Sequence, residues 1–216
     1  MPIQSVHRLL SCLEEYDIIY KNPETKKYSL SLKMIGFSQS MITSLPLWQH
    51  AVPFMKKIVS QTGESVFLTV KEGIEGVIIG GFYNHPDFQE AYPLGKRTPL
   101  SGGTPQKVML AFMDGQRQAR MIKVLKDKGQ LKFPNELQRE LLIIKEKGFA
   151  VTEQGDLQGN ILISTPVFSW EGDVIAAITM ILKKGKFASK ELNQMASLTR
   201  QTAESLSEEM GWIKML

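Results

Sequence analysis

A glycine pair ahead of a predicted helix is the strongest local chemical signal in this sequence. It lies in the segment PLSGGTPQKVMLAFMD, residues 99–114, where Gly102 and Gly103 free the backbone, Thr104 is a suitable N-cap and Pro105 suits the first helical position. Such a turn directs N–H groups and the positive end of the helix dipole at what lies in front, which favours a carboxylate or phosphate. The alternative is an ordinary glycine-rich helix start. The spacing of a P-loop is absent.

Residues that carry catalysis or bind metals are few and scattered. The single cysteine, Cys12, excludes an internal disulfide and a cysteine-rich zinc site, and His7, His50 and His85 show no metal-ligand spacing. No Ser-His-Asp or paired-carboxylate constellation can be picked out. The sequence therefore predicts a protein that is not an enzyme and has no metal or cofactor.

The first residues predict an amphipathic helix. Val6, Leu9, Leu10 and Leu13 fall on one apolar stripe, with Ser5 as N-cap. This stripe should face inward and leave His7 and Arg8 exposed, where they are available to a partner.

A short hairpin is expected after this helix. Ile18–Tyr20 and Lys27–Leu30 flank the turn residues Asn22–Thr25, which places lysines at the tip. A helix followed by such a hairpin is the back half of a winged helix-turn-helix, with the helix in the DNA major groove and the hairpin on the phosphates. The alternative is a small helix and hairpin packed on a larger domain.

The charge composition does not by itself indicate nucleic-acid binding. The net charge is +4, and the segment Met1–Leu30 balances four basic residues against four acidic ones. Residues 116–132 are strongly basic, but the apolar residues between the charges favour the solvated outer face of a helix over a nucleic-acid patch.

Size and composition are those of an ordinary soluble protein, with 216 residues, 43% hydrophobic and 22% charged. No apolar run approaches the roughly 18 residues of a membrane helix, and the N-terminus lacks a signal segment. We therefore expect a cytoplasmic protein.

A hairpin within Gly148–Lys183 is predicted to be the central element around which the rest of the chain, including the glycine turn, is built. Two apolar runs, Asn160–Phe168 and Asp173–Leu182, are joined by the turn Ser169–Gly172. The second run is apolar almost throughout, which predicts a central strand covered on both faces, with a buried helix as the alternative.

Other segments add helices and strands on either side of this hairpin. We expect helices over 31–44, from 47 to 62, from 134 to 147 and over 192–210, strands over 65–70 and 76–82, and a loop over 84–92. This arrangement predicts an α+β fold.

Several motifs in the right order resemble the IclR family of bacterial transcriptional regulators. Ser5-Val-His-Arg-Leu-Leu is similar to the family's recognition helix, and Tyr28-Ser-Leu-Ser-Leu to the end of its wing. The segment from Pro99 to Ala111 is similar to the family's Leu-x-x-Gly/Ala-x-x-Lys-x-Leu-Ala element. Gly148-Phe-Ala, Gly159 and Ser164-Thr-Pro-Val-Phe are similar to its C-terminal signature.

The resemblance implies a partial winged helix-turn-helix in residues 1–30, a linker helix in 31–46 and a GAF-like antiparallel sheet domain with flanking helices in 47–216. The implied DNA-binding residues are Gln4, Ser5, His7, Arg8, Lys26 and Lys27. The implied effector-binding residues are Gly102, Gly103, Thr104, Thr152, Leu162, Thr179 and Ile181. The implied partners are operator DNA, a small organic acid or sugar acid, and further copies of the chain in a homodimer or homotetramer.

Two departures from the family pattern affect the expected function. The family's DNA-binding domain has two further helices before the recognition helix, whereas here that helix follows Met1-Pro2 directly. The alternative to a ligand-responsive regulator is therefore a sensor or oligomerisation module that has lost DNA binding. In the expected pocket, Leu162 and Ile181 replace the hydroxyl or thiol groups common in the family, so a ligand with one acidic end and a hydrocarbon portion is expected.

Overall fold

The computed structural model describes residues 2–152 and 159–213. The chain forms two compact units, Met1–Gln49 and His50–Leu216. Both contain helices and antiparallel strands, which confirms the predicted α+β class. Within the described ranges, no helix combines the length and the apolarity needed to cross a membrane.

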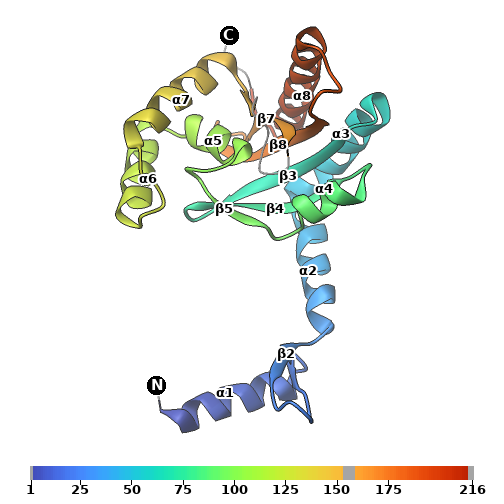
Figure 1. The fold of residues 1–216 in the computed structure, drawn as a ribbon, viewed down its shortest axis with the longest axis vertical. Helices are drawn as coiled ribbons and strands as arrows, with labels where there is room; N and C mark the ends of the chain where they lie inside the picture. The colour runs from blue at the N-terminus through green and yellow to red at the C-terminus, as the bar shows by residue number, and fades with distance from the viewer. Residues whose placement is uncertain (1, 153–158, 214–216) are drawn as a thin grey trace. The chain divides into compact units, whose positions relative to one another are not determined.

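The N-terminal unit consists of a helix, a two-stranded hairpin and a second helix (Figure 1). These elements are α1 (Ile3–Glu15), β1 (Ile19–Lys21), β2 (Tyr28–Leu30) and α2 (Lys33–Ser44). The hairpin is antiparallel, with Tyr20 opposite Ser29. The Asn22 side chain closes its turn by accepting hydrogen bonds from the N–H groups of Glu24 and Thr25, at 2.9 and 2.8 Å. The predicted hairpin is confirmed.

The start of α1 differs from the prediction. The helix begins at Ile3, after Pro2, and has no side-chain cap, so the Ser5 cap is wrong. The N–H of Ser5 already donates to Pro2 O at 3.0 Å, which closes the first turn ahead of Ser5. The predicted end of α2 is confirmed, because Leu45 is extended immediately before Pro46.

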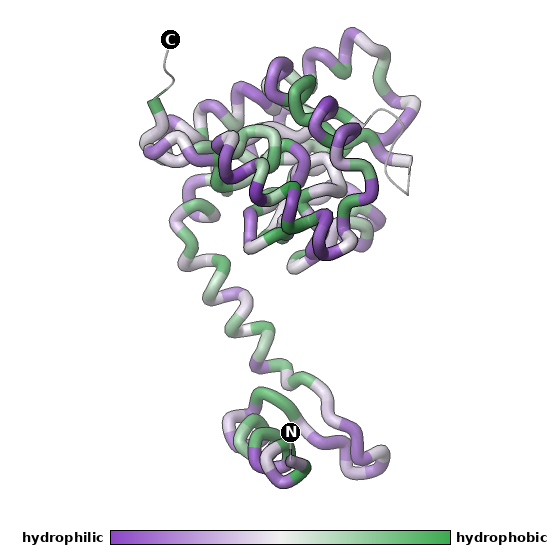
Figure 2. The backbone as a smooth tube through the Cα atoms, turned by 90° about the vertical axis from the view of Figure 1, so that its left-hand side faces the viewer, coloured by the Kyte–Doolittle hydropathy of each residue, from purple (hydrophilic) through white to green (hydrophobic). Residues whose placement is uncertain are grey.

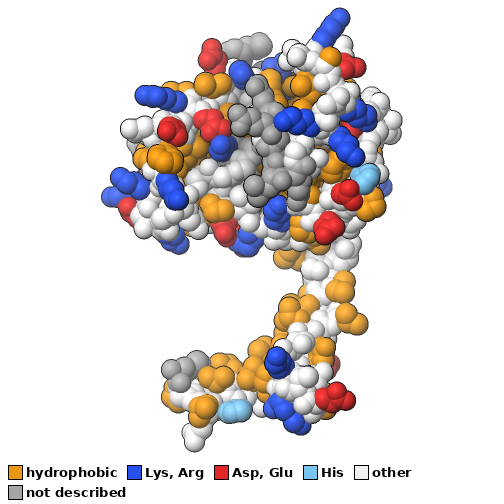
Figure 3. All heavy atoms as spheres, in the orientation of Figure 1, with side chains coloured by type: hydrophobic (Ala, Val, Ile, Leu, Met, Phe, Trp, Pro, Cys, Tyr) orange, Lys and Arg blue, Asp and Glu red, His pale blue; other side chains and the backbone are white. Residues whose placement is uncertain are grey.

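The apolar face of α1 is exposed. His7 and Arg8 are exposed as predicted, but Val6, Leu9 and Leu13 are also 38%, 54% and 38% exposed, so their predicted inward orientation is wrong. Figure 2 shows hydrophobic segments recurring along α1 and α2, and Figure 3 shows hydrophobic side chains on the surface of these helices. The described part of the N-terminal unit therefore covers this face only in part.

The C-terminal unit is built on a six-stranded antiparallel sheet of order β5-β4-β3-β8-β7-β6. The strands are β3 (Ser65–Glu72), β4 (Glu75–Phe82), β5 (Arg97–Pro99), β6 (Ala150–Val151), β7 (Asn160–Phe168) and β8 (Val174–Lys183). β8 lies between β3 and β7, and its residues from Ala176 to Leu182 are buried. The prediction of a central strand paired in a hairpin with residues 160–168 is therefore confirmed.

Helices cover both faces of this sheet (Figure 1). On one face, the Thr199 hydroxyl of α8 (Ser189–Glu209) lies 3.9 Å from the Met180 sulfur of β8. On the opposite face, α5 (Thr104–Ala111) packs against β7 and β8, and Ala177 lies in one apolar cluster with Val108 and Met109. Side chains alternate along a strand, so Thr179 and Ile181 share the face of Ala177. We call this face, covered by α5, the inner face.

The remaining helices correct one prediction. α3 (Pro46–Thr62), α6 (Gly115–Asp127) and α7 (Pro134–Lys147) lie where helices were expected. The expected loop over residues 84–92 instead contains α4 (Pro86–Ala91). His85 Nδ1 accepts the Asp87 N–H at 3.3 Å, and Phe88 and Ala91 are buried, so a side-chain cap and tertiary packing stabilise this short helix.

Candidate functional site

The start of α5 has backbone N–H groups for which the described residues supply no acceptor. Gly103 is the N-cap, with φ 76° and ψ 153°, a conformation that essentially only glycine adopts. Thr104 is therefore the first helical residue, and its predicted capping role is wrong. The Lys107 N–H donates to Gly103 O at 3.2 Å, whereas the N–H groups of Thr104 and Gln106 have no acceptor among the described residues. α5 thus presents unpaired donors and the positive end of its dipole.

The Thr104 hydroxyl connects α5 to the far edge of the sheet. Its Oγ1 is hydrogen-bonded to Thr152 Oγ1, and the Thr152 N–H donates to Leu162 O at 3.0 Å. A side-chain bond to a residue distant in sequence therefore replaces the expected cap. Hydrogen bonds therefore link three of the predicted effector-binding residues in a row, Thr104 to Thr152 and Thr152 to Leu162.

Gln106 lies under the glycine turn. It is only 4% exposed, and a Cβ on Gly76 would lie 2.9 Å from its Nε2. A Cβ on Gly103 would overlap its Oε1. Gly76 and Gly103 therefore make room for the Gln106 carboxamide beside the first turn of α5. Gly102, by contrast, has only ordinary contacts, at 3.8 Å, around the position of a Cβ.

The sheet brings the other predicted effector-binding residues together. Leu162 of β7 lies directly opposite Ile181 of β8, and Ser164 lies opposite Thr179. The hydroxyls of Ser164 and Thr179 are hydrogen-bonded at 2.9 Å, and both residues are fully buried. Leu162, Thr179 and Ile181 therefore form one continuous part of the inner face.

Apolar and aromatic side chains surround Leu162 and Ile181. The cluster consists of Phe67, Ile78, Phe88, Ala91, Tyr92, Leu162 and Ile181. The rings of Phe67 and Tyr92 are stacked with centroids 5.2 Å apart. At its margin, the Tyr83 hydroxyl donates to Tyr92 O at 2.7 Å, and burial raises the pKa of Tyr83 to about 12. This phenol stays neutral near pH 7, so it adds a polar group without adding charge.

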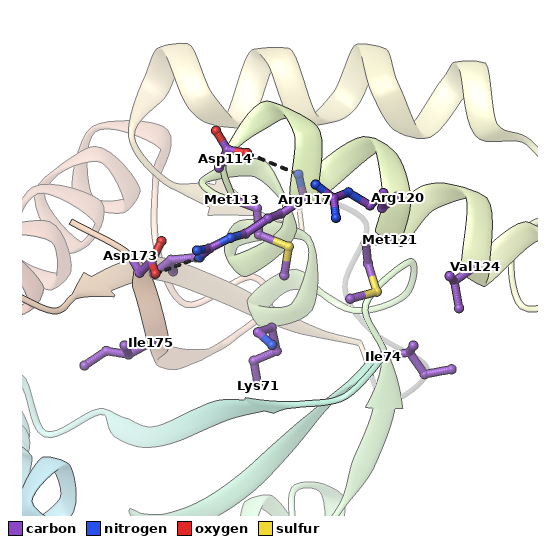
Figure 4. A pocket seen from close by; sticks show the side chains of 11 residues that line it. Lys71, Ile74, Met113, Asp114, Arg117, Arg120, Met121, Val124, Asp173 and Ile175 are labelled. Atoms are coloured by element: carbon purple, nitrogen blue, oxygen red, sulfur yellow. Dashed lines mark hydrogen bonds and ion pairs between the residues drawn. The ribbon is translucent and has the colours of Figure 1, made fainter. Parts of the chain in front are cut away.

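A cavity of about 540 Å³ lies away from these residues (Figure 4). Lys71, Arg117 and Arg120 supply its cationic side chains, and Met113 and Met121 are among its apolar ones. Arg117 donates to Asp173 at 2.7 Å, which raises the pKa of Arg117 through hydrogen bonding and charge attraction. None of the predicted effector-binding residues lines this cavity. The exposure of Arg117 and Arg120 fits the predicted solvated face of a helix.

The predicted DNA-binding residues lie on two elements of the N-terminal unit. Gln4, His7 and Arg8 are exposed on α1, and Ser5 is half-buried there. Lys26 and Lys27 are exposed in the turn between β1 and β2, where Lys26 has φ 59°. The structure therefore places them all within one unit, on a helix and on the tip of a hairpin.

Sequence reasoning did not identify Ser164 and Gln106 as neighbours of the predicted effector-binding residues. Ser164 becomes a neighbour of Thr179 only through the register of β7 against β8. Gln106 follows the glycine turn by three residues, so a periodicity argument could have placed it on the same side of α5 as Gly103. Among the residues placed in the structure, no group of three or more His, Cys, Asp or Glu side chains could hold a metal ion.

Comparison with known proteins agrees with this architecture. The regulator KipR of Bacillus subtilis is 24% identical over 218 residues, covering 98% of this chain and 86% of KipR. The crystal structure of Thermotoga maritima IclR matches with a TM-score of 0.77 and 23% identity, covering 98% of this chain and 87% of that one. An IclR homolog from Microbacterium hydrocarbonoxydans, crystallised with 4-hydroxybenzoate, matches with a TM-score of 0.74 and 19% identity, covering 97% and 86%.

The family assignment rests on the C-terminal unit and the elements that lead into it. The model of the bacterial transcriptional regulator IclR C-terminal family matches residues 39–208. This range contains the inner face, the start of α5 and the β7–β8 hairpin. The chain belongs to the IclR family of bacterial transcriptional regulators.

Proposed function

We propose that this chain is a ligand-responsive, cytoplasmic transcriptional regulator. Residues 1–30 are part of a winged helix-turn-helix that binds operator DNA, and residues 31–46 are the linker helix. Residues 47–216 form a GAF-like domain that binds a small organic acid or sugar acid. A ligand that binds one arrangement of a homodimer or homotetramer more tightly than another shifts the population toward it and so changes DNA binding.

The observation that carries the proposal is the first turn of α5, where Thr104 and Gln106 are buried and the N-cap Gly103 has no side chain to accept a hydrogen bond. The N–H groups of Thr104 and Gln106 have no acceptor in the described chain, and Thr152 links this turn to Leu162 on the inner face. Backbone donors at a helix N-terminus bind carboxylates, and apolar side chains beside them receive a hydrocarbon body. The 4-hydroxybenzoate held by the Microbacterium homolog combines these two features.

A sensor or oligomerisation module without DNA binding is the second candidate. Two observations favour it. The charges of residues 1–30 cancel, with four basic and four acidic side chains. The apolar face formed by Val6, Leu9 and Leu13 is exposed, which suits a protein contact better than a DNA groove.

These 216 residues are expected to bind duplex DNA weakly, no tighter than about 1 µM at physiological salt, with little sequence preference. The balanced charge of residues 1–30 leaves little of the phosphate attraction that dominates such binding. Fluorescence anisotropy on a random duplex pool measures this affinity. Replacing Lys26 and Lys27 by glutamine should weaken binding on every sequence and flatten its salt dependence.

The matched control for the DNA experiment replaces Lys56 and Lys57 of α3, which should leave binding unchanged. Equal binding by all three proteins would favour the module without DNA binding. Nanomolar, sequence-selective binding by the wild type would show that residues 1–30 suffice as a reader and that the charge argument is wrong.

Gly103→Ala is expected to abolish ligand-induced thermal stabilisation, measured over a panel of organic and sugar acids. The new Cβ would overlap Gln106 Oε1 and displace the carboxamide at the first turn of α5. Backbone strain at φ 76°, ψ 153° should also lower stability by about 1–3 kcal/mol.

Gly172→Ala is the control for that strain, because Gly172 has φ 79° but nothing within 4 Å of a Cβ. It should lose stability and keep the full ligand response. If Gly103→Ala responds to the same acids as strongly as Gly172→Ala does, the ligand does not bind at the start of α5.

A further inference from the structure

One buried hydroxyl near the proposed ligand site finds no hydrogen-bond partner in the described ranges. Thr69 of β3 is 0% exposed, and its Oγ1 is without a partner among the described residues. A buried hydroxyl that makes no hydrogen bond is unfavourable, and valine would fill the same space without that penalty. The position therefore calls for a partner that the described residues do not supply.

The strand register places Thr69 on the inner face. β3 pairs with β8 without interruption from Ser65 to Val70, with Thr69 opposite Ala177 and Phe67 opposite Thr179. Directly opposed residues share a face, so Thr69 lies diagonally across from Thr179. Diagonal neighbours in an antiparallel pair lie about 7 Å apart, which is close enough for one small molecule to contact both hydroxyls.

The hydroxyls of Thr69, Ser164 and Thr179 have two protons that no described residue accepts. Ser164 and Thr179 share one hydrogen bond, which uses one of their two hydroxyl protons. The Thr69 proton is the second unused donor. Around them the inner face carries apolar side chains, among them Phe67 and Ile181. The missing partner is therefore an uncharged oxygen acceptor set in an apolar body.

We propose that Thr69 is a ligand-binding residue, which donates its hydroxyl proton to a carbonyl, hydroxyl or ether oxygen of the bound acid. This inference rests on the proposed function, in which the start of α5 holds the carboxylate. Thr69 and the Ser164–Thr179 pair then select acids that carry a second oxygen over acids of the same skeleton without it.

Matched pairs of acids test this selectivity, with lactate against propionate and 4-hydroxybenzoate against benzoate. In calorimetric titrations of the full chain, the oxygenated member of at least one pair should bind the wild type about five- to tenfold more tightly, as one neutral hydrogen bond predicts. Thr69→Val should remove this preference, and Thr69→Ser should retain it.

The control is Thr165→Val, because Thr165 is an equally buried threonine on the opposite face of the sheet, where its hydroxyl donates to Thr199 O at 3.3 Å. It should keep the preference. Thr69→Val should melt at the wild-type temperature or above it, which separates lost recognition from lost folding.

Two results would overturn the inference, and they differ in what else they reject. If Thr69→Val binds the oxygenated acids with the full wild-type preference, only the role of Thr69 is rejected, and its hydroxyl is satisfied by internal water. If the wild type binds none of these acids and none of the wider acid panel, the proposed function fails, and the inference fails with it.

Discussion

Phe67→Ala is expected to lower the free energy of unfolding by about 3–5 kcal/mol, the cost of removing a large buried aromatic side chain. Phe67 is 1% exposed on a central strand, its ring stacks on Tyr92 at 5.2 Å, and it shares an apolar cluster with Leu162 and Ile181. Because domains of this kind have a total stability of about 5–15 kcal/mol, the variant should retain only part of it. Urea unfolding followed by circular dichroism measures the change.

Phe82→Ala is the comparison for this experiment. Phe82 ends the neighbouring strand β4 and is half-buried, with Lys56 Nζ 5.6 Å from its ring centroid. Its removal should cost about 1 kcal/mol, since less apolar area leaves water. If Phe67→Ala and Phe82→Ala lower the free energy of unfolding equally, the packing around Phe67 on the inner face contributes no more to stability than the half-buried end of β4.

The parts of the fold that the sequence predicts are those with local signals. The β7–β8 hairpin follows from two apolar runs and the turn between them, and the end of α7 follows from Gly148, which has φ 81° in the left-handed region. Both features are determined by residues close in sequence. The opposition of Leu162 and Ile181 lies within the same hairpin, so this part of the site was within reach of sequence reasoning.

The errors arise where distant residues compete with a local signal. Thr104 and Pro105 look like a cap and a first helical residue, but the Thr104 hydroxyl bonds to Thr152, and Gly103 becomes the cap. The short helix α4 depends on the packing of Phe88 and Ala91, which periodicity over six residues does not reveal.

The unpartnered Thr69 is missed for a related reason. In the segment SVFLTV a threonine is an ordinary strand residue, and nothing local indicates what lies opposite it. Only the pairing of β3 with β8 places it beside Thr179. The two strands are far apart in sequence, so only the tertiary fold brings the Thr69 and Thr179 hydroxyls to neighbouring positions on the inner face.

The exposed apolar residues of α2 lead to a prediction about assembly. Phe37 and Met41 are 48% and 57% exposed and lie one helical turn apart, so they share one face. Lys33 is the only charged residue of this helix. Such a surface is unusual for a helix that stays in water, and we expect it to pack against a second copy of the chain.

Replacing both Phe37 and Met41 by aspartate should raise the dissociation constant of the oligomer at least about 100-fold. Each large apolar side chain contributes about 1.5–3 kcal/mol of association free energy when it is buried. In a twofold-symmetric dimer both copies bury the same side chain, so this contribution is made twice. An aspartate in its place adds the cost of burying a carboxylate. Every 1.4 kcal/mol is a factor of ten, so 100-fold is a lower bound. Light scattering coupled to size exclusion, over a range of micromolar concentrations, reports the mass.

The matched control places two aspartates at Gln39 and Thr43, which are also exposed and one turn apart but point to the opposite side of α2. It adds the same charge to the same helix, so any loss of helix stability from the charge appears in both variants. Only the Phe37 and Met41 variant should become monomeric. A wild type that is already monomeric would show that this face of α2 holds no second copy. If instead the two variants dissociate alike, the apolar side chains of α2 contribute nothing to the contact, which then lies elsewhere.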